Sequence, residues 1–378
     1  MEPVSEKPSR WFRANLWVHR WASLVATLPF LVLCVTGIVL IFHEEIDAAL
    51  GTVPTNTAPT QARLADCMES VRRDFPDQRI ISVGLDPEGH PGVFLAVVNA
   101  ADATGFDGAT LSFYDLGTGQ RLGDSDPSKT LTGFILELHA EWFMGPVGRL
   151  LGALIGLLVV ASLLSGLVIY APYMRKVAFG VIRRARGQRL TQLDLHNVIG
   201  ALVLGWAVVV SVTGFLLGFS QVALGLWQYA DLRALREEFA QVEPVDARTP
   251  PASVVDVIGA MEAGAQPGWG VRSVIYPGTD LTTPRHYGVI MGGSDGLDAQ
   301  LLDVTMVDAA TGEVTRRLEM PGYLQSIFVA EPLHFGNYGG LALKVFWTLC
   351  SLLTLFITAN GAWLFFDRRR SRRVAGTA

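Results

Sequence analysis

Four of the seven histidines occupy repeated positions in the chain, and neutral imidazole is a common ligand of transition metals. His19 is followed 16 to 18 residues later by a Val-Thr-Gly run, and His196 is followed by the same run at the same offsets. His139 and His334 each follow a leucine, and a glycine lies 27 residues after each of them. This spacing indicates an internal duplication in which His19 corresponds to His196 and His139 to His334.

The placement of these histidines beside apolar segments predicts what they bind. His19 and His196 stand at the start of one pair of segments, and His139 and His334 precede the other pair across a Gly-rich step. A twofold axis along the membrane normal would bring His19 beside His196 at one face and His139 beside His334 at the other. Imidazole pairs held by helix bundles are axial ligands of haem iron. We therefore expect two bis-histidine haems, with iron held by all four histidines.

Small neighbouring residues and the cysteine pattern refine this expectation. Ser23 and Gly200 lie one turn beyond His19 and His196, so they leave room for a flat, bulky group. The chain has no C-x-x-C-H motif, which predicts noncovalent haem b. The simpler alternative for any single histidine at a helix end is an interfacial residue without a ligand role. His43 has no counterpart in the second half, and it is a candidate alternative ligand or substrate contact, with a structural role favoured.

Four apolar stretches are long enough to cross a bilayer, which takes about 20 residues. Half of the 30 Lys and Arg residues fall in three short segments, 1–20, 174–190 and 367–378. The positive-inside rule places these segments in the cytoplasm and the two long acidic loops outside. We expect a multi-pass protein of a bacterial inner membrane with both termini cytoplasmic, in contact with the lipid bilayer and not with nucleic acid. The near absence of other ionisable residues in the apolar stretches argues against a pump or transporter.

The expected organisation has nine parts, given in chain order. They are a cytoplasmic N-terminus (1–20), a first span (21–43), an external domain (44–138), a His-bearing segment with the second span (139–172), a basic cytoplasmic loop (173–195), a third span (196–220), a second external domain (221–333), a His-bearing segment with the fourth span (334–366) and a basic cytoplasmic tail (367–378).

The two external segments also resemble each other in pattern. Residues 60–75 and 251–264 have helical periodicity, and each is followed by alternating runs typical of strands. The turns "DLGTGQ" and "DAATGE" carry the Asp and Gly of a hairpin. The predicted fold class is an integral membrane α-helical protein, with a four-helix transmembrane bundle built from two parallel repeats, each with an external α+β domain.

Several stretches resemble the PepSY-associated transmembrane family, namely "VTGIVLIFHEEID", "LTQLDLHNVIG", "LHFGNYGG" and "NGAWLFFDRRR". The external segments are similar to its PepSY-type domains. Within the family, the length and four-span plan resemble FoxB-like inner-membrane ferric-siderophore (ferrioxamine-type) reductases, which hold two haems b. The resemblance implies that His19, His196, His139 and His334 are the haem ligands. The second copy has "HNV" where the first has "HRW", which leaves an exchange of ligand partners open.

The function expected from these features is electron transfer across the membrane to Fe(III) in a periplasmic siderophore chelate of the hydroxamate type. Reduction would release Fe(II), because hard oxygen ligands hold Fe(III) better than Fe(II). The enzyme would be an oxidoreductase with no catalytic residues beyond the haem ligands and an unidentified electron donor on the cytoplasmic or membrane side. Two alternatives stay open: a non-redox PepSY scaffold that regulates a peptidase, and the haem subunit of a quinol-linked periplasmic redox enzyme.

Overall fold

The computed structural model describes residues 9–52, 54, 56, 61–85, 92–174, 177–293, 302–318 and 320–375, with the backbone alone for 127 and 368–375. The chain divides into two compact units. The helical unit contains the residues up to Phe42, Ile135–Phe219 and the residues from Ala330 onward. The sheet unit contains His43–Phe134 and Ser220–Val329.

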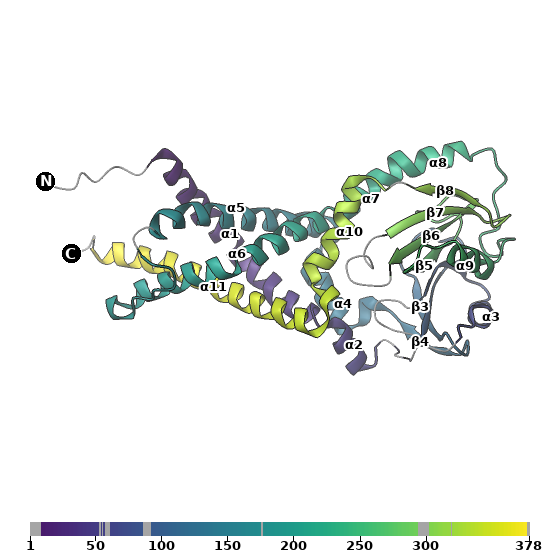
Figure 1. The fold of residues 1–378 in the computed structure, drawn as a ribbon, viewed down its shortest axis with the longest axis horizontal. Helices are drawn as coiled ribbons and strands as arrows, with labels where there is room; N and C mark the ends of the chain where they lie inside the picture. Colours follow the sequence, from purple (N-terminus) through teal and green to yellow (C-terminus); the bar gives the residue numbers. More distant parts are fainter. Residues whose placement is uncertain are drawn as a thin grey trace. The chain divides into compact units, whose positions relative to one another are not determined.

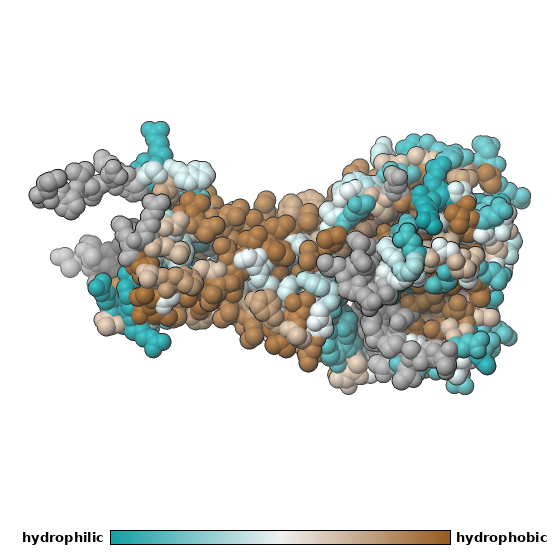
Figure 2. Space-filling view, viewed as in Figure 1, coloured by the Kyte–Doolittle hydropathy of each residue, from teal (hydrophilic) through white to brown (hydrophobic). Residues whose placement is uncertain are grey.

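Four long helices form the helical unit (Figure 1): α1 (Arg10–Leu40), α5 (Gly145–Met174), α6 (Gln188–Gly218) and α11 (Gly340–Ala375). Each contains a stretch long and apolar enough to cross a membrane. Their large apolar side chains are widely exposed, and Figure 2 shows hydrophobic residues over the visible face of these helices. Since a water-soluble bundle would bury such side chains, the chain is an integral membrane helical protein.

The four helices are arranged in a ring. Helix α1 packs against α5 and α11, and α6 packs against the same two helices, so α1 and α6 lie diagonally opposite. Small residues allow close approach where α5 meets α6. A Cβ atom on Gly156 would lie 3.1 Å from the Ser211 carbonyl oxygen, and one on Gly218 would lie 2.7 Å from the Ala153 Cβ. Small residues at such crossings are typical of membrane helix pairs.

The helices extend beyond the segments that hydropathy predicts. Helix α1 begins at Arg10, where the side chain of Ser9 caps it by accepting a hydrogen bond from the Phe12 N–H, although 1–20 was expected to precede the span. Residues 188–195 of the expected loop belong to α6, and residues 367–375 of the expected tail belong to α11. Hydropathy marks only the apolar part of a helix, whereas Arg and Gln are good helix formers that continue it into water.

The described residues of the sheet unit form one sheet of eight strands, in the order β4-β3-β2-β1-β5-β6-β7-β8. Their bounds are β1 (Arg79–Leu85), β2 (Val93–Asn99), β3 (Thr110–Asp115), β4 (Arg121–Ser125), β5 (Trp269–Ile275), β6 (His286–Gly293), β7 (Leu302–Asp308) and β8 (Val314–Leu318). All neighbouring strands are antiparallel.

Within the described part of the chain, seven shorter α-helices accompany the strands or connect them to the long helices: α2 (His43–Leu50), α3 (Leu64–Asp74), α4 (Leu131–Leu136), α7 (Ser220–Trp227), α8 (Arg233–Glu238), α9 (Val254–Ala263) and α10 (Gly322–Phe335). Single turns of other helix types occur at η2 (Pro127–Lys129), η3 (Glu137–Glu141), η4 (Arg184–Arg186), η5 (Gln228–Leu232) and η7 (Asn337–Gly339). Each half of the unit therefore follows the order helix and then four strands.

The continuous sheet differs from the two separate external domains that the sequence suggests. Strand β1 pairs with β5 through Ser82–Ile275, Val83–Val274 and Gly84–Ser273. This pairing satisfies backbone groups that two isolated four-stranded sheets would leave on exposed edges. Local patterns identify strands but not which edges meet, so the join could not be read from the sequence.

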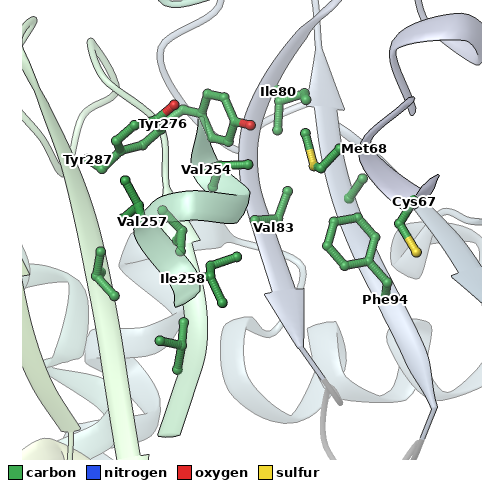
Figure 3. Packing of buried hydrophobic residues seen from close by; sticks show 14 of the residues in the cluster. Cys67, Met68, Ile80, Val83, Phe94, Val254, Val257, Ile258, Tyr276 and Tyr287 are labelled. Carbon is green, nitrogen blue, oxygen red and sulfur yellow. The ribbon is translucent and has the colours of Figure 1, made fainter. Parts of the chain in front are cut away.

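One hydrophobic core serves both halves of the sheet (Figure 3). Met68 of α3 and Val257 of α9 pack with strand residues such as Val83 and Phe94, all of them buried. The rings of Tyr276 and Tyr287 meet edge to face at 5.2 Å. Burial of apolar surface stabilises such a core by roughly 25 cal/mol per Å².

Candidate functional site

His19 of α1 and His196 of α6 lie together inside the helical unit. Their ring centroids are 6.4 Å apart and the ring planes are inclined at 80°. The two histidines come from helices that are diagonally opposite in the ring, so both side chains reach the space that the four helices enclose. Helix α1 begins and helix α11 ends at the end of the bundle where this pair lies.

His139 and His334 form a second pair of the same kind. His139 lies in η3, just before α5, and His334 lies near the end of α10, just before α11. Their ring centroids are 6.2 Å apart, with planes inclined at 64°. The structure thus brings together the histidines that the sequence pairs, and it does not exchange their partners.

The separation of the imidazole rings in each pair matches that of two ligands on one metal ion. Two imidazoles bound to opposite sides of one metal ion have centroids about 6.3 Å apart, given metal–nitrogen bonds of about 2.0–2.1 Å and a ring radius of roughly 1.1 Å. Both pairs have this separation. Among the described residues, no group of three or more His, Cys, Asp and Glu side chains is arranged to hold a metal. An ion at either pair would need its remaining ligands from another molecule, as the nitrogens of a porphyrin supply them.

Hydrogen bonds fix which ring nitrogen is free in three of the four histidines. The hydroxyl of Thr36 lies 2.8 Å from the Val32 carbonyl oxygen and 2.7 Å from the His139 Nδ1. A hydroxyl has one proton and the carbonyl can only accept, so both contacts are made at once when the Thr36 hydroxyl donates to Val32 and His139 Nδ1–H donates to Thr36. Nε2 of His139 then carries the lone pair, which is the state a metal ligand needs.

The duplicated positions repeat this arrangement. His334 Nδ1 lies 3.0 Å from the Val210 carbonyl oxygen and 3.1 Å from the Thr213 hydroxyl. His19 Nδ1 donates to the Ser162 carbonyl oxygen at 2.8 Å. Each of these contacts leaves Nε2 as the nitrogen available for a ligand bond.

His196 is the exception. Its Nδ1 is buried and has no hydrogen-bond partner within the described part of the chain. The carbonyl of Ile357, which corresponds to Ser162 in the duplication, faces this nitrogen without completing a hydrogen bond.

A glycine of a neighbouring helix lies against each histidine ring. Cβ atoms placed on Gly166 and Gly361 would lie 3.0 and 3.2 Å from Cε1 of His19 and His196. Those placed on Gly37 and Gly214 would lie 3.4 and 3.0 Å from Cε1 of His139 and His334. These are the glycines whose regular spacing marks the duplication. Their absent side chains leave room for the rings at this distance.

A tight corner positions His139. Its π-helical turn ends at Trp142, and both Trp142 and Phe143 have left-handed backbone angles, with φ of 54° and 56°. Gly148 of the next helix is so close that a Cβ atom would clash with the Glu141 carbonyl. Non-glycine residues rarely adopt such angles, and π-turns of this kind often occur at functional sites.

A salt bridge joins the π-helical turn η3 to the start of α5. Arg149 Nε donates to the Glu141 carboxylate at 2.9 Å, and its Nη2 donates to the same oxygen at 2.5 Å. Both side chains are about three-quarters buried, so the pair is partly shielded from water. The sequence does not predict this turn before α5. The turn depends on the left-handed backbone angles of Trp142 and Phe143 and on the ion pair between Glu141 and Arg149, eight residues apart.

Two tryptophans lie between the histidine pairs. Trp206 of α6 is ten residues beyond His196, which is about 15 Å along the helix. Its ring meets that of Trp347 of α11 at 6.4 Å, edge to face. Trp347 Nε1 donates to the His334 carbonyl oxygen at 3.2 Å. These contacts form an aromatic connection from the second histidine pair towards the first.

Asp194 supports the first pair in a way that sequence reasoning missed. It is 2% exposed and lies two residues before His196. Its carboxylate accepts hydrogen bonds from the Tyr173 hydroxyl at 2.6 Å and from the backbone and side chain of Arg183 at 2.8 to 3.0 Å. These bonds tie the loop after α5 to the helix that bears His196. An acidic residue at the edge of an apolar stretch was the available signal.

Other histidines do not join the pairs. His43 begins α2 and belongs to the sheet unit. His286 begins β6 and is 1% exposed, with Nδ1 2.6 Å from the Thr283 hydroxyl. Burial lowers the pKa of His286, so it is a neutral core residue at pH 7. His90 lies outside the described residues.

Comparison with protein families matches residues 16–368 to the PepSY-associated TM region. The chain belongs to this family. A relative from Pseudomonas aeruginosa, "Uncharacterized protein PA4219", is 26% identical over 254 residues, which make up 63% of this chain and 64% of the relative. The match thus spans less than two thirds of that relative, and its name carries no activity. The matched range begins before His19 and ends beyond His334, so all four paired histidines lie within the region that the family shares.

Proposed function

We propose that this PepSY-associated protein is a di-haem oxidoreductase that carries electrons across a bacterial inner membrane to a ferric siderophore. The observation that carries the proposal is the pair of histidine couples at duplicated positions, each with the ring separation of two axial ligands on one iron. In this proposal the FoxB-like reductases are the nearest functional analogy, and both termini lie in the cytoplasm.

The residues present fit haem b. His19 and His196 would hold one group and His139 and His334 the other, through the Nε2 atoms that the Nδ1 contacts leave free. The adjoining glycines give each ring space against its helix. Haem b, when bound, supplies one-electron Fe(III)/Fe(II) chemistry, and the protein supplies ligands, orientation and a low-dielectric surrounding.

The protein's own aromatic side chains support transfer over the distance involved. The two histidine pairs are separated by most of a membrane span, and Trp206 and Trp347 lie along the interval. The chain has no need of an acid, base or nucleophile in this role, because no bond to carbon is made or broken.

The substrate we propose is Fe(III) in an external hydroxamate-type chelate. One electron delivered near His139 and His334 reduces Fe(III) to Fe(II), and the hard oxygen ligands then release the softer ion. The positive-inside distribution of Lys and Arg supports this direction, since it places the acidic sheet unit outside.

The test is the absorption spectrum and pyridine haemochrome of the purified full chain. We expect two noncovalent haems b per chain and low-spin bis-histidine bands that sharpen with dithionite. A colourless protein from haem-replete cells would contradict the proposal and favour a non-redox PepSY scaffold. Haems that transfer no electrons to a ferric hydroxamate would favour the haem subunit of a separate periplasmic enzyme.

A further inference from the structure

An uncharged stretch in the second half of the chain is longer than one membrane span requires. Residues 195–230 contain no Asp, Glu, Lys or Arg, whereas the corresponding stretch of the first half covers residues 21–43. A span takes about 20 apolar residues, so 21–43 suffices for one crossing and 195–230 extends well beyond one. The excess forms helix α7 and the turn η5, which follow Phe219 at the end of α6.

Helix α7 has one buried face and one exposed apolar face. Trp227 is 5% exposed and belongs to a buried apolar cluster with Leu232. On the other side, Val222, Leu226 and Tyr229 are 54%, 53% and 69% exposed. Their spacing of four and then three residues places them along one side of the helix, and we call these three residues the apolar stripe. The packing of Trp227 holds α7 in place, so the apolar stripe is a fixed surface that faces outward.

Charged residues begin where the apolar stripe ends. Asp231 is the first after Tyr229, and the guanidinium of Arg233 lies over the Tyr229 ring, 5.6 Å from its centroid. Arg233 Nε also donates to the Glu237 carboxylate at 2.8 Å. Tyrosine is enriched at membrane–water boundaries, and arginine there keeps its stem on the apolar side and its charge in water. The order of side chains from Val222 to Arg233 is therefore that of a helix leaving a lipid surface.

The first half of the chain lacks this apolar stripe. Helix α2 corresponds to α7 in the duplication, and Glu45 and Ala49 stand where Val222 and Leu226 do. Glu45 and Ala49 are also exposed, so the two helices present the same positions outward. If turning the chain after a span required an apolar surface, both halves would have one. The apolar stripe therefore serves a purpose of the second half alone.

The chain brings the apolar stripe to the membrane boundary. Helix α6 contains a candidate span that ends at Gly218, and Val209 and Val212 are among its exposed apolar side chains. Val222 is four residues beyond Gly218, so it lies within about 14 Å of the end of the span even if the chain between them is fully extended. The apolar stripe thus continues the lipid-facing surface of α6. Three side chains cannot supply the roughly 800 Å² per partner that a stable protein interface buries, which disfavours a second copy of the chain as the occupant.

We propose that helix α7 lies in the interfacial layer of the lipid leaflet at the C-terminal end of α6, with Val222, Leu226 and Tyr229 against the acyl chains. A helix in this layer is buried about 5–10 Å into the boundary between headgroups and acyl chains. Its partner is the fluid lipid itself, and Arg233 marks the point at which the chain returns to water. The inference concerns attachment to lipid, so it stands whether or not the chain binds haem.

Photo-crosslinking in a bilayer tests which molecule covers the apolar stripe. The full chain carries p-benzoylphenylalanine in place of Leu226 or, as the matched control, in place of Ala49, and is irradiated in vesicles of phosphatidylcholine and phosphatidylglycerol. Mass spectrometry should find a phospholipid adduct at position 226 with a yield several-fold above that at position 49. Equal yields at the two positions, or a crosslink from position 226 to a second copy of the chain, would overturn the inference.

Thiol accessibility provides an independent measurement. Leu226→Cys and Ala49→Cys place thiols at exposed positions of the same unit, whereas the three native cysteines are buried. In the same vesicles, a charged, water-soluble maleimide should modify the thiol at position 226 several-fold more slowly than the thiol at position 49. Adding Val222→Glu to Leu226→Cys should remove much of this protection, because the apolar stripe then carries the charge that α2 has at Glu45. Equal modification rates in the two single variants, with both folded by circular dichroism, would show that α7 lies in water.

Discussion

At the scale of single residues, the histidines depend on the groups that bind their second nitrogen. Thr36 and Thr213 occupy duplicated positions, and each hydroxyl lies within hydrogen-bond distance of a histidine Nδ1. His334 Nδ1 also lies 3.0 Å from the Val210 carbonyl oxygen, whereas the Leu33 carbonyl approaches His139 without completing a hydrogen bond, so His334 depends less on its threonine. Removing the hydroxyl at Thr36 and at Thr213 should therefore weaken haem binding to different degrees, which tests how the orientation of the histidine ring contributes to haem affinity.

We predict that Thr36→Val weakens haem binding at His139 by roughly 10–100-fold, the range found when supporting contacts of metal ligands are removed. Valine has nearly the shape of threonine, so the change removes the hydrogen bond with little repacking. Haem retention during dilution in detergent, followed by absorbance, measures the effect.

Thr213→Val is the matched control, and its smaller effect should follow from the remaining Val210 carbonyl. Equal retention of haem by Thr36→Val and the wild type would show that Nδ1 orientation does not limit binding.

At the scale of secondary-structure elements, the two hairpins of the sheet unit share an acidic turn residue. Asp308, after β7, accepts a hydrogen bond from the Ala310 N–H at 2.7 Å and from Arg285 Nε at 2.9 Å. Burial alone would raise the pKa of Asp308, but these contacts together hold it below its ordinary value of 3.8. Asp115 occupies the corresponding turn and accepts from the N–H groups of Gly117 and Thr118, with its pKa also lowered.

Because the folded-state pKa of Asp308 is depressed, its contribution to stability is complete above pH 3.8 and is lost as pH falls through the lower, folded-state value. We predict that Asp308→Asn lowers the unfolding free energy by about 1 kcal/mol at pH 7 and removes part of the acid sensitivity. Thermal melts of the full chain at pH 7 and at about pH 3 measure both effects.

Asp115→Asn should act in the same direction with a smaller effect, since the Asn56 side chain and the donors of Gly117 and Thr118, with no guanidinium among them, hold that carboxylate. A variant of Asp308 with the same acid sensitivity as the wild type would mean that this turn does not titrate on unfolding.

The aromatic connection between the histidine pairs is also a property of elements, since it requires α6 and α11 to be adjacent. We predict that Trp206→Leu leaves both haems bound and slows electron transfer between the pairs by roughly tenfold, equivalent to about 1.4 kcal/mol in the barrier. Flash photolysis with absorbance detection measures this rate.

Phe30→Leu, on α1, serves as the control, because Phe30 packs in a separate apolar cluster with Ala26 and Ile155. A rate that falls in the Phe30 variant and not in the Trp206 variant would place the electron path in the first half of the chain.

Much of this arrangement follows from periodicity, and the remainder depends on contacts that periodicity does not encode. The repeat spacing predicts which histidines meet, because a twofold axis relates duplicated residues, and the ring distances agree with it. Hydropathy predicts four spans, and the described residues contain four candidate spans. The β1–β5 junction, the left-handed corner at Trp142 and the role of Asp194 each arise from contacts between distant segments or from backbone angles. Such features carry no local pattern.

At the scale of the whole molecule, the remaining question is the direction of electron flow. In the proposed function, His139 and His334 hold the haem that meets the external chelate, and His19 and His196 hold the haem that receives electrons first. Electron entry then occurs at one end of the helical unit and reduction of the chelate at the other. A substitution at one end should therefore block only one of these two reactions.

We predict that His334→Ala abolishes reduction of a ferric hydroxamate while dithionite still reduces the haem held by His19 and His196, because the two pairs share no ligand. Ferrozine colour in sealed vesicles measures the release of Fe(II), and the wild type should produce it only when the chelate reaches the face that bears the sheet unit. Gly322→Ala, which has no atom within 4 Å of an added Cβ and begins the same helix as His334, is the control and should retain activity. Chelate reduction at the wild-type rate in His334→Ala, or reduction only from the face that bears both termini, would contradict outward electron transfer.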